Sequence, residues 1–159
     1  MKTFNAVLLG LATGVVLTAA ATWVVMPKLM ITTHESRLGF DETVATLQTA
    51  ATGKQWLIPK VYDMQASLKK EGYADMSKLS ILSLCQPHYA YNILKNDSDK
   101  FVTAVMPCRM GVYETADGKV MISGMNMGLM SKMFGGNIAK VMGGVADEEA
   151  QMLSQVVKQ

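Results

Sequence analysis

The sequence predicts an α+β protein in which a small, mostly antiparallel sheet packs with helices and follows one transmembrane helix. Three observations lead to this expectation. Residues 4–26 are almost uniformly apolar, strand-like and helix-like patterns alternate after them, and an Asp117-Gly118 turn joins two strand-like segments. At 159 residues the chain is short enough for one globular domain. We expect a transmembrane anchor over residues 1–28 and one α+β domain over residues 29–159.

The N-terminal segment contains no charged residue between positions 4 and 26. As a helix it would cross a hydrocarbon core of about 30 Å, and Trp23 and Lys28 suit the interface at its far end. A signal peptide is the alternative, because Ala19–Ala21 offers a small-residue cleavage site. A short tail before a single span usually leaves the domain outside the cytoplasm. We therefore expect an inner-membrane anchor with a periplasmic or other extracytoplasmic domain.

The first half of the globular part alternates strands and helices. The β-branched end of Leu29–Thr33 indicates a strand, and the helical spacing of apolar residues indicates a helix over residues 39–52. Pro59 interrupts the next strand, residues 56–62, which becomes an edge or bulged strand. A short helix over residues 65–71 follows.

The second half begins with an apolar run over residues 79–85 that suits a central strand. Pro87 fits the first turn of a helix that reaches Lys95. Strand segments are expected over residues 101–106 and 109–114, and the Asp-Gly turn then leads to a strand over residues 119–123.

The C-terminal region is rich in methionine, and residues 125–134 fit either a strand or a helix. A helical pattern over residues 137–142 is interrupted by Gly143-Gly144. A last helix is expected to begin at Asp147–Glu149, since acidic side chains favour a helix N-terminus.

Net charge excludes one class of function. The charge of +2 comes from Lys2 and Lys28, because the rest of the chain holds 13 basic and 13 acidic residues. With no basic stripe, nucleic acid is not an expected partner. Nucleophile elbow, HExxH and phosphate-cradling glycine patterns are absent from the sequence, and Glu114 has no evident acidic partner. A non-catalytic domain is therefore the first expectation.

Both cysteines belong to one succession of motifs. A strand ends in Cys85-x-Pro87, and Pro107-Cys108 opens a segment that continues to Tyr113-Glu114 and the hairpin. With Met133–Gly136 near the C-terminus, this order resembles the domain of unknown function 302 family over about residues 30–155. The resemblance implies a compact α+β domain that tends to form dimers, sometimes behind an N-terminal anchor, with no established activity. It assigns no chemical role to the six motif residues, which are Cys85, Pro87, Pro107, Cys108, Tyr113 and Glu114.

Cys85 and Cys108 allow three interpretations. They are buried thiols, a structural disulfide, or a site whose thiolates bind a soft metal or exchange disulfides. His88 lies three residues after Cys85 and adds an imidazole, and Met106 or Met110 adds a thioether. A site for copper or for non-covalently bound haem is therefore a hypothesis. The Cys-x-x-Cys pattern is absent, which weakens thioredoxin-like exchange.

Methionine clusters in one region, since eight of the 14 lie between Met106 and Met142. Flexible thioether side chains suit an irregular core or a dimer interface. Gly10 and Gly14 match a small-xxx-small pattern for helix pairing. We expect a membrane-anchored, homodimeric binding or interaction module. A thiol-disulfide redox enzyme and a purely structural dimeric domain are the alternatives.

Overall fold

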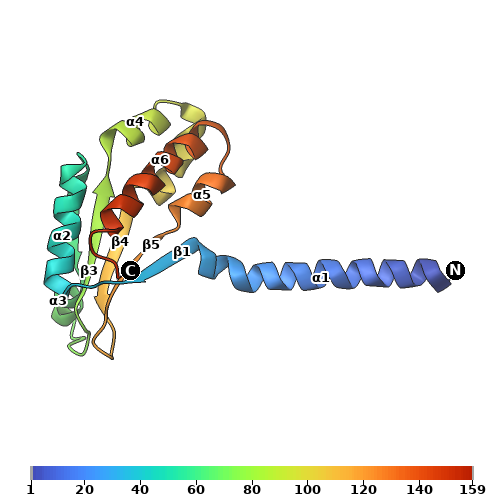
Figure 1. The fold of residues 1–159 in the computed structure, drawn as a ribbon, viewed down its shortest axis with the longest axis horizontal. Coiled ribbons are helices and arrows are strands. Elements are labelled where there is room, and N and C mark those ends of the chain that lie inside the picture. Colours follow the sequence, from blue (N-terminus) through green and yellow to red (C-terminus); the bar gives the residue numbers. More distant parts are fainter. Residues whose placement is uncertain (1, 159) are drawn as a thin grey trace.

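A computed structural model describes residues 2–158, except for the side chains of residues 2, 3 and 5–9. It has two parts (Figure 1): the long helix α1 (Lys2–Met30), and a globular part from which that helix projects. The N-terminus lies at the far end of α1, and the C-terminus lies beside the sheet. The apolar N-terminal helix and the globular part are thus distinct in this structure.

Helix α1 is the one candidate membrane span among the described residues. Its segment Gly10–Met30 contains a window of mean hydropathy 1.6, none of which is buried in the protein. The helix is therefore suited to be a membrane anchor or a signal sequence. Its end is bound to the globular part by Asn126. The backbone N–H of that residue donates to the carbonyl of Met30 (2.8 Å), and its side-chain Nδ2 donates to the carbonyl of Leu29 (2.9 Å).

The sheet has five strands in the order β1-β5-β4-β3-β2, and every neighbouring pair is antiparallel. The strands are β1 (Ile31–Glu35), β2 (Leu57–Asp63), β3 (Leu79–Cys85), β4 (Cys108–Glu114) and β5 (Val120–Met125). Strand β3 lies inside the sheet, as its apolar run predicted. Strand β2 lies at the edge, and its register shifts between Leu57 and Lys60, around Pro59. The edge position of β2 and its register shift both follow from Pro59, which has no backbone N–H to donate to a neighbouring strand.

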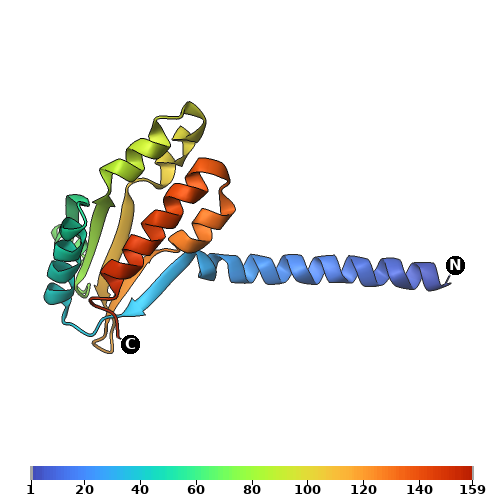
Figure 2. The same ribbon diagram turned by 45° about the horizontal axis from the view of Figure 1, so that its top comes forward.

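Helices cover one face of this sheet (Figures 1 and 2). They are α2 (Phe40–Gly53) and α6 (Gly136–Leu153), with α4 (Pro87–Leu94) and α5 (Met127–Met133) beside α6, while α3 (Met64–Lys70) links β2 to β3. On the covered face, Leu82, Val112 and Ile122 come from adjacent strands and are at most 1% exposed. Alternation of side chains along each strand turns these residues toward the helices and forms the core.

The other face of the sheet carries apolar side chains that remain exposed or half-buried. Ile31, Leu57 and Tyr62 are between 37% and 56% exposed, and Ile81 and Tyr113 are partly buried. Both faces of the sheet therefore carry apolar side chains, but helices cover one of them.

One predicted strand is wrong. Residues 101–106 lie largely in a 3-10 helix, η1 (Asp97–Val105), instead of extending the sheet. Val102 and Val105 are three residues apart, which places them on one side of such a helix, and Val102 is 2% exposed. Asn96 donates a side-chain hydrogen bond to Asp99 (3.1 Å) and supports the turn. The apolar residues follow a helical spacing here, which the strand prediction overlooked.

The predicted break at Gly143-Gly144 is also wrong, because α6 runs without interruption from Gly136 to Leu153. A β-carbon on Gly144 would lie 2.9 Å from the hydroxyl of Tyr89. The glycine therefore allows α4 to approach α6 closely. Residues 125–134, which fitted either structure, end strand β5 and then form α5, and the Asn126 side chain caps that helix by accepting from the N–H of Leu129.

Candidate ligand-binding site

A cavity of about 470 Å³ is lined by residues along the length of β3 and β4, from Leu79 and Tyr113 at one end to Cys85 and Cys108 at the other. Leu84, Cys108 and Gly124 line it from the face of the sheet that the helices cover. Helices α4 and α6 also line it. The helices contribute mostly apolar side chains: Ala90, Ile93, Met142 and Val145, with Tyr89 and Glu149. Residues of the uncovered face, including Ile81 and Tyr113, also belong to its lining. Its size and apolar character are those of small-molecule sites in proteins.

The structure brings both cysteines to this cavity. Cys108 pairs with Leu84 across the β3–β4 ladder, and Cys85 is the next residue of β3. Both are free thiols and partly buried. Burial, the charge of Glu149 and the charge of Cys85 together raise the pKa of Cys108 to about 12. Its sulfur is therefore a protonated thiol at neutral pH.

The other predicted metal ligands are distributed differently. His88 is exposed on α4 and lies outside the lining of the cavity, with its Nε2 2.9 Å from Nδ2 of Asn92. Met106 lines the cavity, and Met110 is buried beneath the helices. In the described part of the chain, no group of three or more His, Cys, Asp or Glu side chains is placed to hold a metal ion. Copper or haem binding at these residues stays a prediction.

The four remaining motif residues have separate positions. Pro87 opens α4 at its first turn, where the preceding Gln86 side chain accepts from the N–H groups of His88 (2.6 Å) and Tyr89 (3.2 Å). Pro107, which follows a cis peptide bond, and Tyr113 line the cavity. Glu114 pairs with Val120 at the hairpin end of β4, away from the two thiols.

A hydrogen-bonded cluster forms one side of the cavity. Glu148 accepts from Nε1 of Trp56 (2.6 Å) and from the hydroxyl of Tyr89 (2.8 Å), so each of its carboxylate oxygens has a donor. The two aromatic rings meet edge to face with centroids 6.5 Å apart. The hydrogen bond to Glu148 raises the pKa of Tyr89, with smaller contributions from burial and from the negative charges nearby. This cluster fixes α4 and the start of β2 against α6.

Glu149 is the polar residue that the sequence analysis missed. It was assigned to a helix N-terminus, but α6 begins thirteen residues earlier, at Gly136. Its Oε1 lies 3.2 Å from the position of a β-carbon on Gly124. Burial raises the pKa of this carboxyl group to about 7. A signal was present in the sequence, because Glu149 follows Val145 by four residues and precedes Met152 by three, on the apolar side of the helix.

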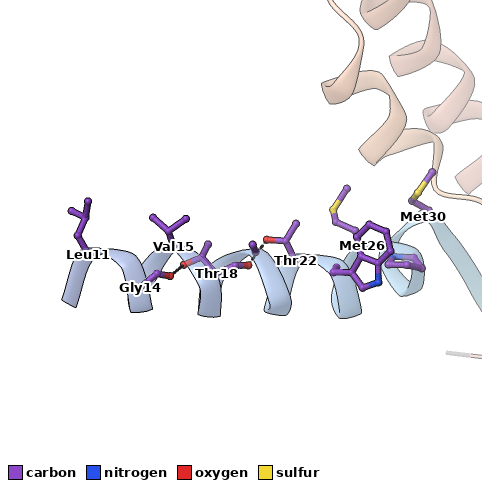
Figure 3. Close-up of a pocket in the computed structure, with 10 residues that line it drawn as sticks. Leu11, Gly14, Val15, Thr18, Thr22, Met26 and Met30 are labelled. Atoms are coloured by element: carbon purple, nitrogen blue, oxygen red, sulfur yellow. Dashed lines mark hydrogen bonds between the residues drawn. The ribbon is translucent and has the colours of Figure 1, made fainter. Parts of the chain in front are cut away.

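A second hollow lies along α1 (Figure 3). It follows one side of an exposed helix, past Leu11, Gly14, Thr18 and Thr22. The Oγ1 atoms of Thr18 and Thr22 donate to the carbonyls four residues earlier, at 2.9 and 2.8 Å, so these hydroxyls are satisfied within the helix. This surface offers no titratable side chain and is not a candidate site for chemistry.

Fold and cavity together define an antiparallel α+β domain with an internal space of small-molecule size. The chain belongs to the family described as Domain of unknown function DUF302, whose model matches residues 32–159. Among solved structures it is similar to the crystal structure of an uncharacterized conserved DUF302 protein from Bacillus stearothermophilus. The two share 18% identity with a TM-score of 0.69, over 79% of this chain and 96% of that one.

At this identity the likeness shows the fold alone. No curated protein matches the chain. The family resemblance inferred from the sequence is confirmed, and the activity must be argued from the cavity.

Proposed function

We propose that this protein is a membrane-anchored binding domain that holds a small, mostly apolar molecule in the cavity lined by its sheet, α4 and α6. The observation that carries the proposal is the cavity itself, about 470 Å³ in volume, with an apolar lining and one inward carboxylate, that of Glu149. A few polar groups within an apolar wall are what orient a ligand in a protein site.

Binding is favoured over thiol chemistry by the state of Cys108. The nucleophile and metal ligand in cysteine chemistry is the thiolate, and a thiol with a pKa of about 12 supplies almost none of it at neutral pH. The ligand set predicted for copper or haem also loses its imidazole, because His88 is exposed on α4 and lies outside the lining of the cavity. A small organic ligand needs neither group.

We further place α1 in the inner membrane with the domain on the periplasmic side. Support comes from the exposed apolar helix and from Trp23 and Lys28 near its end, which suit a membrane interface. The hydrogen bonds from Asn126 to the last carbonyls of α1 would hold the domain close to the membrane surface.

We also propose that two copies associate through the uncovered face of the sheet. Support comes from Ile31, Leu57 and Tyr62, apolar side chains that are exposed on the face of the sheet opposite the helices. Anchoring in one bilayer would raise the local concentration of such copies. Mass photometry of the full chain in detergent should report a dimer, and Tyr62→Arg should shift it to monomer; a monomeric wild type would remove this part of the proposal.

The binding function can be tested through Trp56, which lines the cavity. The chain has two tryptophans, so Trp23→Phe leaves Trp56 as the single fluorescent donor. The probe is the neutral apolar dye N-phenyl-1-naphthylamine, added to the full-length Trp23→Phe protein in lipid nanodiscs. We expect saturable energy transfer from Trp56 to the dye.

A matched pair of variants separates the cavity from the lipid. Ala90→Leu narrows the cavity from α4, whereas Ala45→Leu adds the same atoms to the exposed side of α2. The first should weaken dye binding by about tenfold, equivalent to about 1.4 kcal/mol, and the second should leave it unchanged. Equal, non-saturating transfer in all three proteins would show only partition into lipid and would overturn the proposal.

A further inference from the structure

We propose that Glu149 selects the ligand, and that the cavity takes an apolar molecule bearing a protonated amine, which forms an ion pair with the Glu149 carboxylate. This inference rests on the proposed binding function and names the chemical class of the ligand.

The placement of the carboxylate is the first argument. Glu149 projects from α6 onto the covered face of the sheet, and its Oε1 is 3.2 Å from where Gly124 would carry a β-carbon. A glycine in β5 thus leaves room for the carboxylate against the strand. Cys108 lines the same cavity. The half-buried Glu149 therefore belongs to the cavity wall.

The second argument is the contrast between two adjacent glutamates. Glu148 receives hydrogen bonds from Trp56 and Tyr89, one on each oxygen. Among the hydrogen bonds and ion pairs of the described residues, none involves the carboxylate of Glu149. Every fully buried side-chain oxygen or nitrogen in that part of the chain has a partner, so the unpartnered Glu149 oxygens keep some accessible surface, and Glu149 belongs to the cavity lining. Buried carboxylates normally have partners, and here a bound molecule would supply one.

The third argument is the charge around this carboxylate. Among the residues that line the cavity, Arg109 is the only cation, and it is exposed and alternates along β4 with the inward-facing Cys108 and Met110. Apart from Arg109, the titratable side chains of the lining and of the adjacent positions on α6 are thiols, phenols and acids: Cys85, Cys108, Tyr89, Tyr113, Asp147 and Glu148. None of these groups carries a positive charge that could neutralise an ionised Glu149 carboxylate. A cation must come from the ligand, and an anionic ligand would be repelled.

Protonation links binding to pH. With its pKa raised to about 7 by burial, the empty site holds Glu149 partly protonated near neutral pH. A bound ammonium group favours the ionised carboxylate, so binding an amine below pH 7 displaces a proton from Glu149. Affinity for the amine should therefore rise as pH increases through about 7, as long as the amine itself stays protonated.

The experiment uses three probes of equal chain length: octylamine, 1-octanol and octanoate. Each competes with N-phenyl-1-naphthylamine in the full-length Trp23→Phe protein, in nanodiscs of zwitterionic lipid, at pH 6 and pH 8. We expect octylamine to compete best at pH 8 and octanoate worst. Glu149→Gln should weaken octylamine about tenfold and remove its pH dependence, with 1-octanol unchanged. Asp147→Asn is the matched control, because it removes a neighbouring but exposed charge from the same helix.

Failure of this inference is distinguishable from failure of the binding function. If the dye binds saturably but 1-octanol or octanoate competes as well as octylamine, or if Glu149→Gln leaves octylamine unchanged, the amine is not the ligand class and the cavity remains a binding site. The same holds if octylamine fails to displace bound dye. If the dye itself shows no saturable binding, both proposals fall.

Discussion

The ring of Tyr89 lies directly against Gly144, so that a β-carbon on residue 144 would be 2.9 Å from the tyrosine hydroxyl and 3.2 Å from two ring carbons. The same hydroxyl donates a hydrogen bond of 2.8 Å to Glu148, one turn further along α6. A glycine in α6 and a tyrosine in α4 thus set the distance between the two helices that enclose the cavity.

Replacing Gly144 by alanine should destabilise the domain although alanine favours helix. The new methyl group would clash with the Tyr89 ring, whose displacement would break the hydrogen bond to Glu148 and cost about 1–3 kcal/mol. Gly143→Ala is the control, because nothing lies within 4 Å of its β-carbon position. The free energy of unfolding of Gly143→Ala should rise by up to about 1 kcal/mol, because alanine has the higher helix propensity. Thermal unfolding would show whether the two substitutions change stability in opposite directions. Equal stability of the two variants would contradict the proposed contact between Gly144 and Tyr89.

The hydrogen bond between Tyr89 and Glu148 should be measurable as a coupling. Tyr89→Phe and Glu148→Gln each weaken the interaction, and each should lower the free energy of unfolding by about 1 kcal/mol. Because the two residues share one contact, the double variant should lose less than the sum of the single losses. Strictly additive losses in a double-mutant cycle would mean that the hydroxyl does not bond to this carboxylate. Trp56→Phe offers an independent check on the other oxygen of Glu148.

Glu149 should make the domain less stable as pH rises from about 4.5 to about 7. Its pKa is raised from the usual 4.5 to about 7 in the folded chain. In that window the unfolded chain has released a proton that the folded chain retains, so the stability present below pH 4.5 is lost by the time pH passes 7. The shift corresponds to about 3 kcal/mol at most.

Glu149→Gln should abolish this contribution to the pH dependence, so that the variant is the more stable protein at pH 8 and similar to wild type at pH 4.5. Melting temperatures of the two proteins across this range provide the measurement. Parallel curves for wild type and Glu149→Gln would show that the carboxyl titrates normally.

Cys108 should react slowly with alkylating reagents. In the Cys85→Ala variant it is the single thiol of the chain, and its pKa of about 12 leaves far less thiolate at pH 8 than an ordinary cysteine has. Alkylation by iodoacetamide should be slower than for a free cysteine by on the order of a thousandfold. Unfolding in guanidinium should restore the normal rate. Rapid labelling of the folded protein, or a mass two hydrogens lower in the wild type because of a disulfide, would contradict the buried free thiol.

Helix α1 should remain part of the mature protein and hold it in the membrane. Intact mass would show the whole chain, whereas cleavage near Ala19–Ala21 would remove about the first 20 residues. Membranes washed in alkaline carbonate should retain the full chain and release a variant that lacks residues 2–28. A periplasm-dependent reporter such as alkaline phosphatase, fused after the last residue, should be active; activity only from a cytoplasmic reporter would reverse the proposed orientation.

Local chemistry made much of the fold predictable. Residues 115–119 form the predicted hairpin turn, in which Gly118 has a φ of 80° and the N–H of Thr115 bonds to the carbonyl of Lys119 (2.9 Å). Glycine adopts that backbone conformation at little cost, so the Asp-Gly pair is a sufficient signal. Pro59 marked an edge strand for an equally local reason. The apolar run over residues 79–85 marked an inner strand in the same way.

The sequence by itself therefore determined the apolar N-terminal helix, all five strands within two residues at each end, and the family. The tertiary structure decided the site. Whether Glu149 is a solvated acid at a helix start or an unpaired carboxylate in a cavity depends on which face of α6 meets Gly124, 25 residues earlier in the chain, and Cys108 beyond it. Burial is a property of packed surfaces, and a glutamate acquires a pKa of about 7 only when those distant strands remove its water.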